Sequence, residues 1–323
     1  TLTYNTVLNL VNVKGQNGDK GDKGDKGDTG ADGKDGKDGR GIAKTELING
    51  ELIITYTDGT SDNLGSISSD ITDSISMLNF TRLDDGTLSV AIKEEYKTIA
   101  ENIVIPSTYN GKTVSTIENN GFENCKYLSH ITIPSTINTI GASAFKECSQ
   151  LNNIVMPDSV TEIGSGAFWQ CTSLAEITIP KYVAIIRAAT FYNCTSLKTV
   201  KLPEGLTTIE SHPNGTFGKC TSLNSIILPD SLTYIGGFAF TNCTLLTELT
   251  IPKNVVFIGQ GSISRTNIKS VYFEEPNGWS SSRLGTIEAV SASTLSNPKD
   301  AAERLNRTYY YDGSNSYYSY SRK

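Results

Sequence analysis

The second half of the chain repeats a fixed pattern of apolar positions between residues 103 and 270. Each unit carries a cysteine, with phenylalanine three residues before it, leucine three residues after it and proline nine residues after it. Successive cysteines are 23, 23, 23, 26 and 23 residues apart. A period of this length predicts a solenoid, because one turn cannot bury its own apolar side whereas stacked turns bury it continuously. The cysteines are Cys125, Cys148, Cys171, Cys194, Cys220 and Cys243.

One clean unit, ITIPSTINTIGASAFKECSQLNN, predicts the course of a turn. The L-x-x-I-x-I stretch alternates like a strand with one buried face, and proline ends it where an amide donor is no longer needed. A second short strand, V-x-x-I, follows it. Glycine and alanine then allow a tight turn that delivers phenylalanine to the core.

These repeats closely resemble the BspA-like leucine-rich repeat family, whose unit reads I-x-I-P-x-x-v-x-x-I-g-x-x-A-F-x-x-C-x-x-L. The resemblance covers residues 103–270 and implies a β-rich leucine-rich-repeat solenoid. Three departures are local. Arg187 and Glu210 replace the turn glycine, the fourth full unit has three extra residues around 211–215, and the last unit lacks its phenylalanine and cysteine.

The cysteines allow three interpretations. Thiols one turn apart project in parallel, which is poor geometry for a disulfide. No histidine or second cysteine joins any of them at ligand spacing, so we expect no metal site and no cofactor. We therefore predict a column of small buried thiols that pack turn on turn.

Near the N-terminus, glycine occupies every third position over residues 15–41, which predicts a collagen-like triple helix and therefore a homotrimer. The alternative, a disordered charged linker, gives no reason for the period. Proline is absent from the triplets, so we expect Lys-Gly-Asp ion pairs between chains to stabilise the rod, weakly and in a salt-dependent way. The period consists of Gly15, Gly18, Gly21, Gly24, Gly27, Gly30, Gly33, Gly36 and Gly39.

Several shorter segments flank these two parts. Residues 1–14 form the predicted attachment segment, and we expect no secretory signal in them. Turn signals at Asn49-Gly50 and Asp58-Gly59 predict a three-stranded β-meander over residues 42–66, a neck that three chains would share. The amino-acid sequence of this segment resembles a short module of tail and baseplate proteins from phages of Gram-positive bacteria. Residues 67–77 are predicted as a linker, with a short trimeric helix as the alternative, and residues 78–102 as the N-terminal cap.

The C-terminal cap is predicted over residues 271–323. Asn297 and Pro298 mark a helix start, followed by an apolar stripe of Ala301, Ala302 and Leu305. Six tyrosines follow, and aromatic side chains at a tip either contact a sugar or protein or simply cover the last turn. We name Tyr317 and Tyr318 as candidate binding residues.

The composition of the chain argues against several classes of function. The net charge is −6, with no basic stripe for nucleic acid, and no apolar run is long enough to span a bilayer. The chain has two histidines, His130 and His212, and neither stands in a catalytic or metal-ligating pattern, so we expect no enzyme.

The sequence thus predicts an elongated, multi-part fibre with a trimeric rod, a β neck and a solenoid head. We expect a bacteriophage virion fibre or tail protein that attaches through its N-terminus and binds a glycan or protein of the bacterial surface. A bacterial cell-surface adhesin and a purely structural decoration spike are the alternatives. The candidate binding residues on the solenoid are Ile185, Tyr234 and Phe257, large apolar side chains on the outward face of the second strands, and the neighbouring His212; the same face is an alternative trimer contact.

Overall fold

The computed structural model describes residues 42–48, 51–56, 59–66, 74–283, 286–306, 308–311, 314–317 and 319–322. It divides the chain into two compact units, Thr1–Thr72 and Asp73–Lys323. The glycine period and the attachment segment lie outside the described residues, so the triple helix, the trimer and the attachment role stay predictions.

In the first unit, three strands form one antiparallel sheet in the order β1-β2-β3. Their bounds are Ile42–Ile48 for β1, Glu51–Tyr56 for β2 and Ser61–Ser66 for β3. The use of this sheet as a trimeric neck is a prediction that the single chain does not test.

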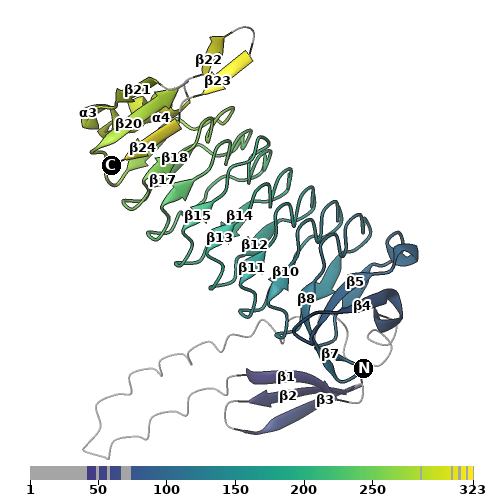
Figure 1. Cartoon of the computed structure of the whole chain (residues 1–323). Helices are drawn as coiled ribbons and strands as arrows, with labels where there is room; N and C mark the ends of the chain where they lie inside the picture. The colour runs from purple at the N-terminus through teal and green to yellow at the C-terminus, as the bar shows by residue number, and fades with distance from the viewer. Residues whose placement is uncertain are drawn as a thin grey trace, which may run out of the picture. The chain divides into compact units, whose positions relative to one another are not determined.

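The second unit is a β-solenoid with two columns of short parallel strands (Figure 1). The first column pairs β6 with β9, β12 with β14 and β17 with β19. These strands have one buried and one outward side, as the alternation predicts. Their bounds are Asn102–Val104, His130–Thr132, Glu176–Thr178, Thr199–Lys201, Glu248–Ile251 and Ser270–Phe273.

Apart from the six-residue strand β8, the second column consists of two-residue strands whose second residue is buried. Parallel pairing joins β8, β10 and β11, and a second run joins β13, β15, β16 and β18. The bounds are Lys112–Ile117 for β8, Thr139–Ile140 for β10, Glu162–Ile163 for β11, Ile185–Ile186 for β13, Thr208–Ile209 for β15, Tyr234–Ile235 for β16 and Phe257–Ile258 for β18.

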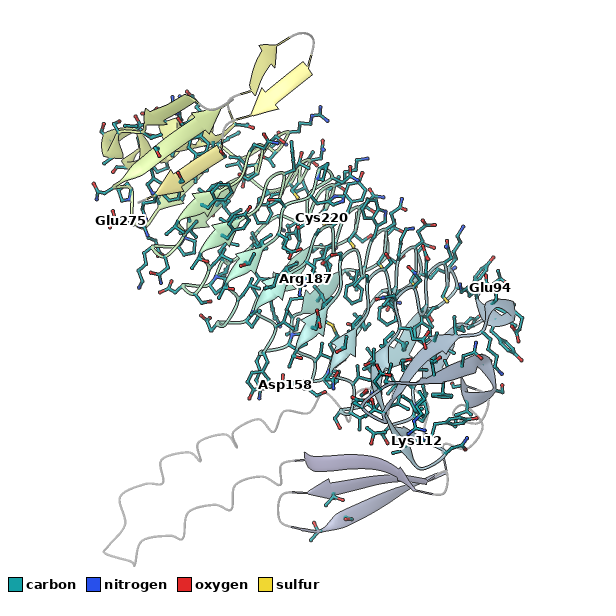
Figure 2. The ribbon with its side chains drawn as sticks, in the orientation of Figure 1. Glu94, Lys112, Asp158, Arg187, Cys220 and Glu275 are labelled. Carbon is teal, nitrogen blue, oxygen red and sulfur yellow. The ribbon has the colours of Figure 1, made fainter. Side chains whose placement is uncertain are left out.

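Between these two runs the column is interrupted. Among the described residues no strand pairing joins β11 to β13, and the interruption coincides with Arg187, the first of the two replaced turn glycines. At the same position one turn earlier, a Cβ on Gly164 would lie 2.3 Å from the amide nitrogen of Ala142. Arg187 lies against its neighbours through ion pairs, at 3.2 Å to Glu162 and 3.2 Å to Glu210 (Figure 2). Glu210, the second replacement, therefore supplies a carboxylate partner for the guanidinium group of Arg187, the first.

The core contains two columns in which the same side chain recurs in successive turns. Six buried phenylalanines stack with ring centroids 5.3–5.5 Å apart and nearly parallel planes: Phe122, Phe145, Phe168, Phe191, Phe217 and Phe240. Beside them the six cysteines are free and buried, which confirms the predicted thiol column; Figure 2 labels Cys220. Each thiol from Cys148 onward also donates to the carbonyl of a phenylalanine in the preceding turn, as Cys171 Sγ does to Phe145 at 3.1 Å. This bond gives cysteine a specific role that its small size alone does not explain.

At the N-terminal end, residues 74–77 are helical, and the hairpin of β4 (Leu78–Arg82) and β5 (Leu88–Ile92) extends the second column, because β5 pairs with β8 in parallel. A short 3₁₀ turn, η1 (Glu94–Tyr96), follows, and β7 (Thr108–Tyr109) pairs with β8. The apolar residues Leu88, Val90 and Ile92 are buried against the first turn. This hairpin therefore covers the end of the core.

At the C-terminal end, α4 (Pro298–Leu305) starts at Asn297, whose side chain accepts from the amides of Lys299 and Asp300. The predicted helix start is confirmed, and so is its buried stripe of Ala301, Ala302 and Leu305. The last strand, β24 (Ser319–Arg322), returns to pair antiparallel with both β18 and β20. The remaining elements are β20 (Trp279–Arg283), β21 (Thr286–Ala289), α3 (Ala292–Ser296), β22 (Thr308–Tyr311) and β23 (Ser314–Tyr317). The described helices include none that is long and apolar enough to cross a bilayer.

The buried thiols should resist modification in the native protein. Burial raises the pKa of Cys171 and Cys220 well above the usual thiol value, and that of Cys194 and Cys243 to about 12. Almost no thiolate is therefore present at pH 8, and thiolate is the reactive form. We expect a maleimide or disulfide reagent to label the native chain slowly and to add six groups after unfolding without reductant, counted by mass spectrometry. Fewer than six adducts would mean that some cysteines are oxidised in solution.

Candidate functional site

The three-residue insertion forms a tight loop on the turn that follows the second strand. The hydroxyl of Ser211 accepts from the amide of Gly237 at 2.9 Å and lies 3.1 Å from the hydroxyl of Tyr234. At the other end of the loop, the buried hydroxyl of Thr216 donates to the carbonyl of Glu210 at 2.7 Å. The insertion is therefore fastened to the next turn through Ser211 and closed on its own turn through Thr216 and Glu210.

Two glycines make this loop possible. Gly215 has φ +82°, and a Cβ there would lie 2.0 Å from the carbonyl oxygen of Phe238 in the next turn. A Cβ on Gly218 would lie 1.7 Å from the carbonyl oxygen of Asn214. Neither position admits a side chain unless the backbone moves, so the loop depends on both glycines.

His212 belongs to the packing of the loop. Its Nδ1 accepts from the amide of Asn214 at 3.1 Å, and its ring meets the edge of Trp169, with the ring centroids 5.8 Å apart. Partial burial lowers the pKa of His212 below the usual histidine value. The ring is therefore neutral at pH 7 with its proton on Nε2, and it carries no positive charge for a ligand.

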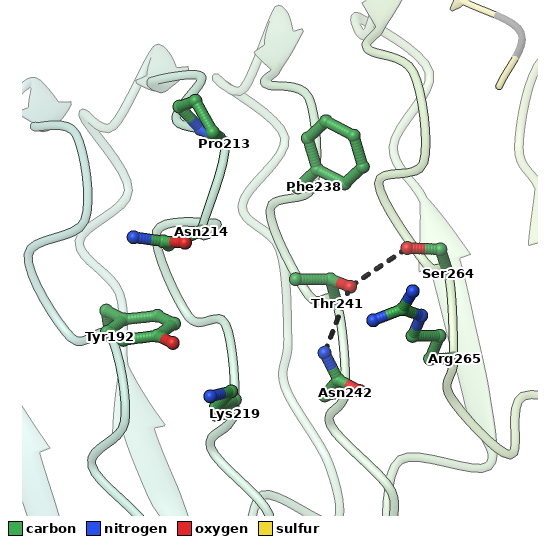
Figure 3. A pocket seen from close by; sticks show the side chains of 9 residues that line it. All are labelled: Tyr192, Pro213, Asn214, Lys219, Phe238, Thr241, Asn242, Ser264 and Arg265. Carbon is green, nitrogen blue, oxygen red and sulfur yellow. Dashed lines mark hydrogen bonds between the residues drawn. The ribbon is translucent and has the colours of Figure 1, made fainter. Parts of the chain in front are cut away.

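A cavity of about 350 Å³ lies beside the insertion (Figure 3). Its origin is one column of residues, each directly after the core position that phenylalanine occupies in six turns and Ile263 in the last. Trp169 and Tyr192 fill this column in two turns, with ring centroids 4.4 Å apart, and the next three turns carry Gly218, Thr241 and Ser264. The change from large to small residues leaves a hollow that ends against the ring of Tyr192.

The walls of the hollow are chemically different. Pro213, Asn214 and Phe238 line one side, and Lys219, Asn242 and Arg265 line the other (Figure 3). Two buried hydroxyls, those of Thr241 and Ser264, lie 2.9 Å apart in the hollow. Lys219 Nζ also lies 5.4 Å from the ring centroid of Tyr192. The cavity thus offers aromatic faces, hydroxyls, amides and two cations.

Phe238 adopts a backbone conformation that is unfavourable for its residue type. Its φ is +58°, in the left-handed region, where a bulky side chain costs roughly 1–2 kcal/mol. The same position in other turns is occupied by Asn120, Ser143, Gly166, Ala189, Gly215 and Gly261, all of them small and all with positive φ. The phenylalanine is half-buried at the boundary of two cavities. Strain of this kind is commonly found at functional sites.

The second cavity, of about 380 Å³, lies on the other side of Pro213 and Phe238. His212 and Phe257, both predicted binding residues, line it, and Tyr234 stacks on Phe257 with ring centroids 4.7 Å apart. These three candidates therefore lie together. Ile185 lies apart from them, because Thr208 stands between Ile185 and Tyr234 in the sheet, and the binding role of all four residues stays a prediction.

The C-terminal tyrosines have different positions. Tyr320 is buried in β24 and its hydroxyl donates to the carbonyl of Arg304, so this ring covers the end of the core. Tyr317 ends strand β23, whose backbone pairs with β22, and Tyr318 lies outside the described residues. Their predicted binding role is untested.

Sequence reasoning missed the first cavity. The sequence pattern that could have revealed it is the column directly after the phenylalanine position of each repeat. In that column two aromatic residues are followed by Gly218, Thr241 and Ser264. Phe238 was equally visible as the one aromatic residue at its repeat position. In the described part of the chain, no three His, Cys, Asp or Glu side chains lie close enough to hold a metal ion.

Comparison with known proteins bears on the repeats alone. A family model described as a BspA type leucine rich repeat region matches residues 94–214 and, in an overlapping match, residues 161–283. No curated protein matches the chain.

Three solved bacterial structures are similar to the chain. A leucine-rich repeat protein from Bacteroides ovatus ATCC 8483 is 28% identical over 60% of this chain and 56% of its own, with a TM-score of 0.48. One from Eubacterium ventriosum ATCC 27560 is 28% identical over 59% and 50%, with a TM-score of 0.47. A leucine rich cell surface protein from Faecalibacterium prausnitzii A2-165 is 26% identical over 67% and 57%, with a TM-score of 0.44. The match thus spans little more than half the length of each of those chains.

Because Phe238 is strained and Phe240 is not, replacing them should change the free energy of unfolding by different amounts. Phe238→Asn, which places the residue of Asn120 at the same repeat position, should change the free energy of unfolding by less than about 1 kcal/mol, because relief of strain offsets the lost ring contacts. Phe240→Ala, two residues later, should cost about 3–5 kcal/mol, because it opens a cavity in the phenylalanine stack. Urea unfolding followed by circular dichroism measures both. A large loss for Phe238→Asn would show that the ring serves stability.

Proposed function

This chain belongs to the BspA-type leucine-rich repeat family, and we propose that it is a non-enzymatic protein that binds a bacterial cell surface through its solenoid. The observation that carries the proposal is the insertion at residues 211–215, which interrupts a regular repeat and has a cavity on each side. Insertions in repeat proteins fall on one face, often the binding face. We define the insertion face as this loop together with the linings of the two cavities and the adjoining Tyr234.

The insertion face has the composition of a recognition surface. Tyr192, Tyr234, Phe238 and Phe257 present aromatic rings, and such rings are enriched where proteins contact sugars and other proteins. Both cavities exceed about 300 Å³, the lower end of the size range of small-molecule sites. A bacterial glycan or surface protein is the proposed partner.

We also propose that three chains act together outside the cell, as a fibre of a bacteriophage virion or tail. The glycine period of residues 15–39 and the phage-like segment 42–66 support this proposal. Three solenoids on one rod would bind a repetitive surface with higher avidity than one. The same solenoid would serve a bacterial surface adhesin, which is the alternative setting.

Cell binding tests the role of the insertion face. Fluorescently labelled chain should bind intact cells of a susceptible bacterial strain, and Tyr234→Ala with Phe257→Ala should weaken binding about tenfold or more, because stacked aromatic residues dominate such contacts. Flow cytometry over a series of protein concentrations gives the apparent affinity. The matched control, Tyr127→Ala with Tyr182→Ala, removes two exposed rings elsewhere on the solenoid and should bind normally.

Two results would contradict this assignment. If the insertion-face variant binds cells as well as the control does, the face has no role in attachment. If it binds normally but the three heads separate, as seen by small-angle scattering, the face is a contact between solenoids of one trimer.

The glycine period predicts the assembly state. Light scattering of the full chain at low temperature should give a mass near three times 34.9 kDa, because a triple helix needs three chains. The trimer should melt at lower temperature in high salt, because ion pairs replace proline as the source of stability. A monomer mass with intact residues 15–39 would remove the fibre from the proposal and leave the binding solenoid.

A further inference from the structure

The cavity beside Tyr192 carries an excess of positive charge in an acidic chain. Lys219 and Arg265 both line it, and no aspartate or glutamate does. In the described part of the solenoid, Lys146, Lys181, Arg187 and Lys253 are each paired with a carboxylate, whereas Lys219 and Arg265 are not. The chain as a whole has a net charge of −6, so two unpaired cations in one cavity are a local feature.

The fold places these cations in a fixed row. Lys219, Asn242 and Arg265 occupy the same position in three successive turns, 23 residues apart, and each has φ between +57° and +59°. The amide of Lys219 donates to the carbonyl of Thr241 at 2.8 Å, and that of Asn242 donates to the carbonyl of Ser264 at 3.0 Å. The side-chain amide of Asn242 therefore stands between an ammonium group and a guanidinium group along one edge of the cavity (Figure 3).

The other surfaces of the cavity suit a sugar ring. Phe238 faces the cation row from the insertion side, and Tyr192 closes one end (Figure 3). Aromatic rings pack against the C–H face of a pyranose, while the hydroxyls of Thr241 and Ser264 can exchange hydrogen bonds with its hydroxyl groups. Lys219 and Arg265 would then pair with a carboxylate or phosphate on the ring or on the next unit.

We propose that this cavity binds an anionic saccharide, a ligand class that rests on the proposed function and makes it specific. The shared chemistry is a sugar or polyol unit with a negative group, as a uronic acid or a sugar phosphate provides. An acidic peptide would satisfy the cations but would not use the facing aromatic ring and the hydroxyl pair.

The experiment uses the full chain and four defined probes in isothermal titration calorimetry. Oligogalacturonate supplies carboxylates on sugar rings, and mannose 6-phosphate supplies a phosphate on a sugar ring. Methyl-esterified oligogalacturonate keeps the sugar rings without the charge, and polyglutamate keeps the charge without the rings. We expect binding to at least one of the first two probes, weakened by raising salt, and binding at least about tenfold weaker to the last two.

Variants locate the binding on the chain. Lys219→Gln with Arg265→Gln should weaken binding of the anionic saccharide about tenfold or more, because it removes both charge-assisted contacts. Phe238→Asn should weaken binding of the same probe by removing the aromatic wall. The control Lys198→Gln with Lys269→Gln removes the same charge from exposed positions outside the cavity and should bind normally.

Three results would overturn the proposal. They are equal binding of the esterified probe or of polyglutamate, equal binding by the cavity variant and its control, and binding of neither anionic saccharide. In the last case cell binding separates the two proposals: if the chain still binds cells through the insertion face, only the ligand class is wrong. If it binds neither cells nor probes, the proposed function is wrong as well.

Discussion

Hydrogen bonds between the backbones of successive turns determine the rest of this structure. The amide of Phe145 donates to the carbonyl of Ala167 at 2.8 Å, and that of Glu147 donates to the carbonyl of Trp169 at 2.7 Å. The same bonds recur outside the strands, along the whole irregular side of the solenoid. Because the same bonds recur at the same repeat positions in turn after turn, residues of equal register lie in columns. A buried column can then be filled by similar side chains in successive turns, as phenylalanine stacks on phenylalanine and thiol follows thiol.

Outward columns do not have to repeat one type of side chain. The candidate site lies where the residue type in one such column changes from large to small. Directly after each core phenylalanine, the column begins with the ion pair of Glu123 and Lys146, at 2.7 Å, and continues with Trp169 and Tyr192. Replacing such side chains by glycine, threonine and serine opens a hollow without disturbing the core beneath it. The insertion raises one wall of that hollow. Changes at single register positions thus create a cavity on the solenoid while the core stays the same.

Structural features that depend on local or periodic sequence patterns could be predicted, whereas those that depend on contacts between residues far apart in the chain could not. The burial of Phe122 and Cys125 and of their repeats follows from the period, and the helix start at Asn297 and Pro298 is local, so both were predictable. The interruption at Arg187 and its pairing with Glu210 could be noticed as departures, but their consequence depends on how closely two turns approach. The burial of Tyr320 was beyond reach, because β24 pairs antiparallel with a strand that lies 60 residues earlier in the chain. Ile185 lies on the predicted outward side of its strand, but it is separated from Tyr234 by the smaller, polar Thr208.

The left-handed positions show how the side chains of this face can vary without loss of the fold. At Phe238 the amide donates to Gln260 at 2.9 Å and the carbonyl accepts from Thr241 at 3.0 Å, so the neighbouring turn and the turn's own bonds fix the conformation. The two equivalent bonds hold Gly166 in the same region of φ, and the amide of Asn193, also at positive φ, donates to the carbonyl of Gly218 at 2.7 Å. A residue placed there therefore adopts positive φ whatever its side chain prefers, and an unfavourable residue costs only its own strain. A stack of turns that fixes its backbone in this way can carry lysine, arginine or phenylalanine where glycine or asparagine would be more stable, and the side chains are then held in place before any ligand arrives.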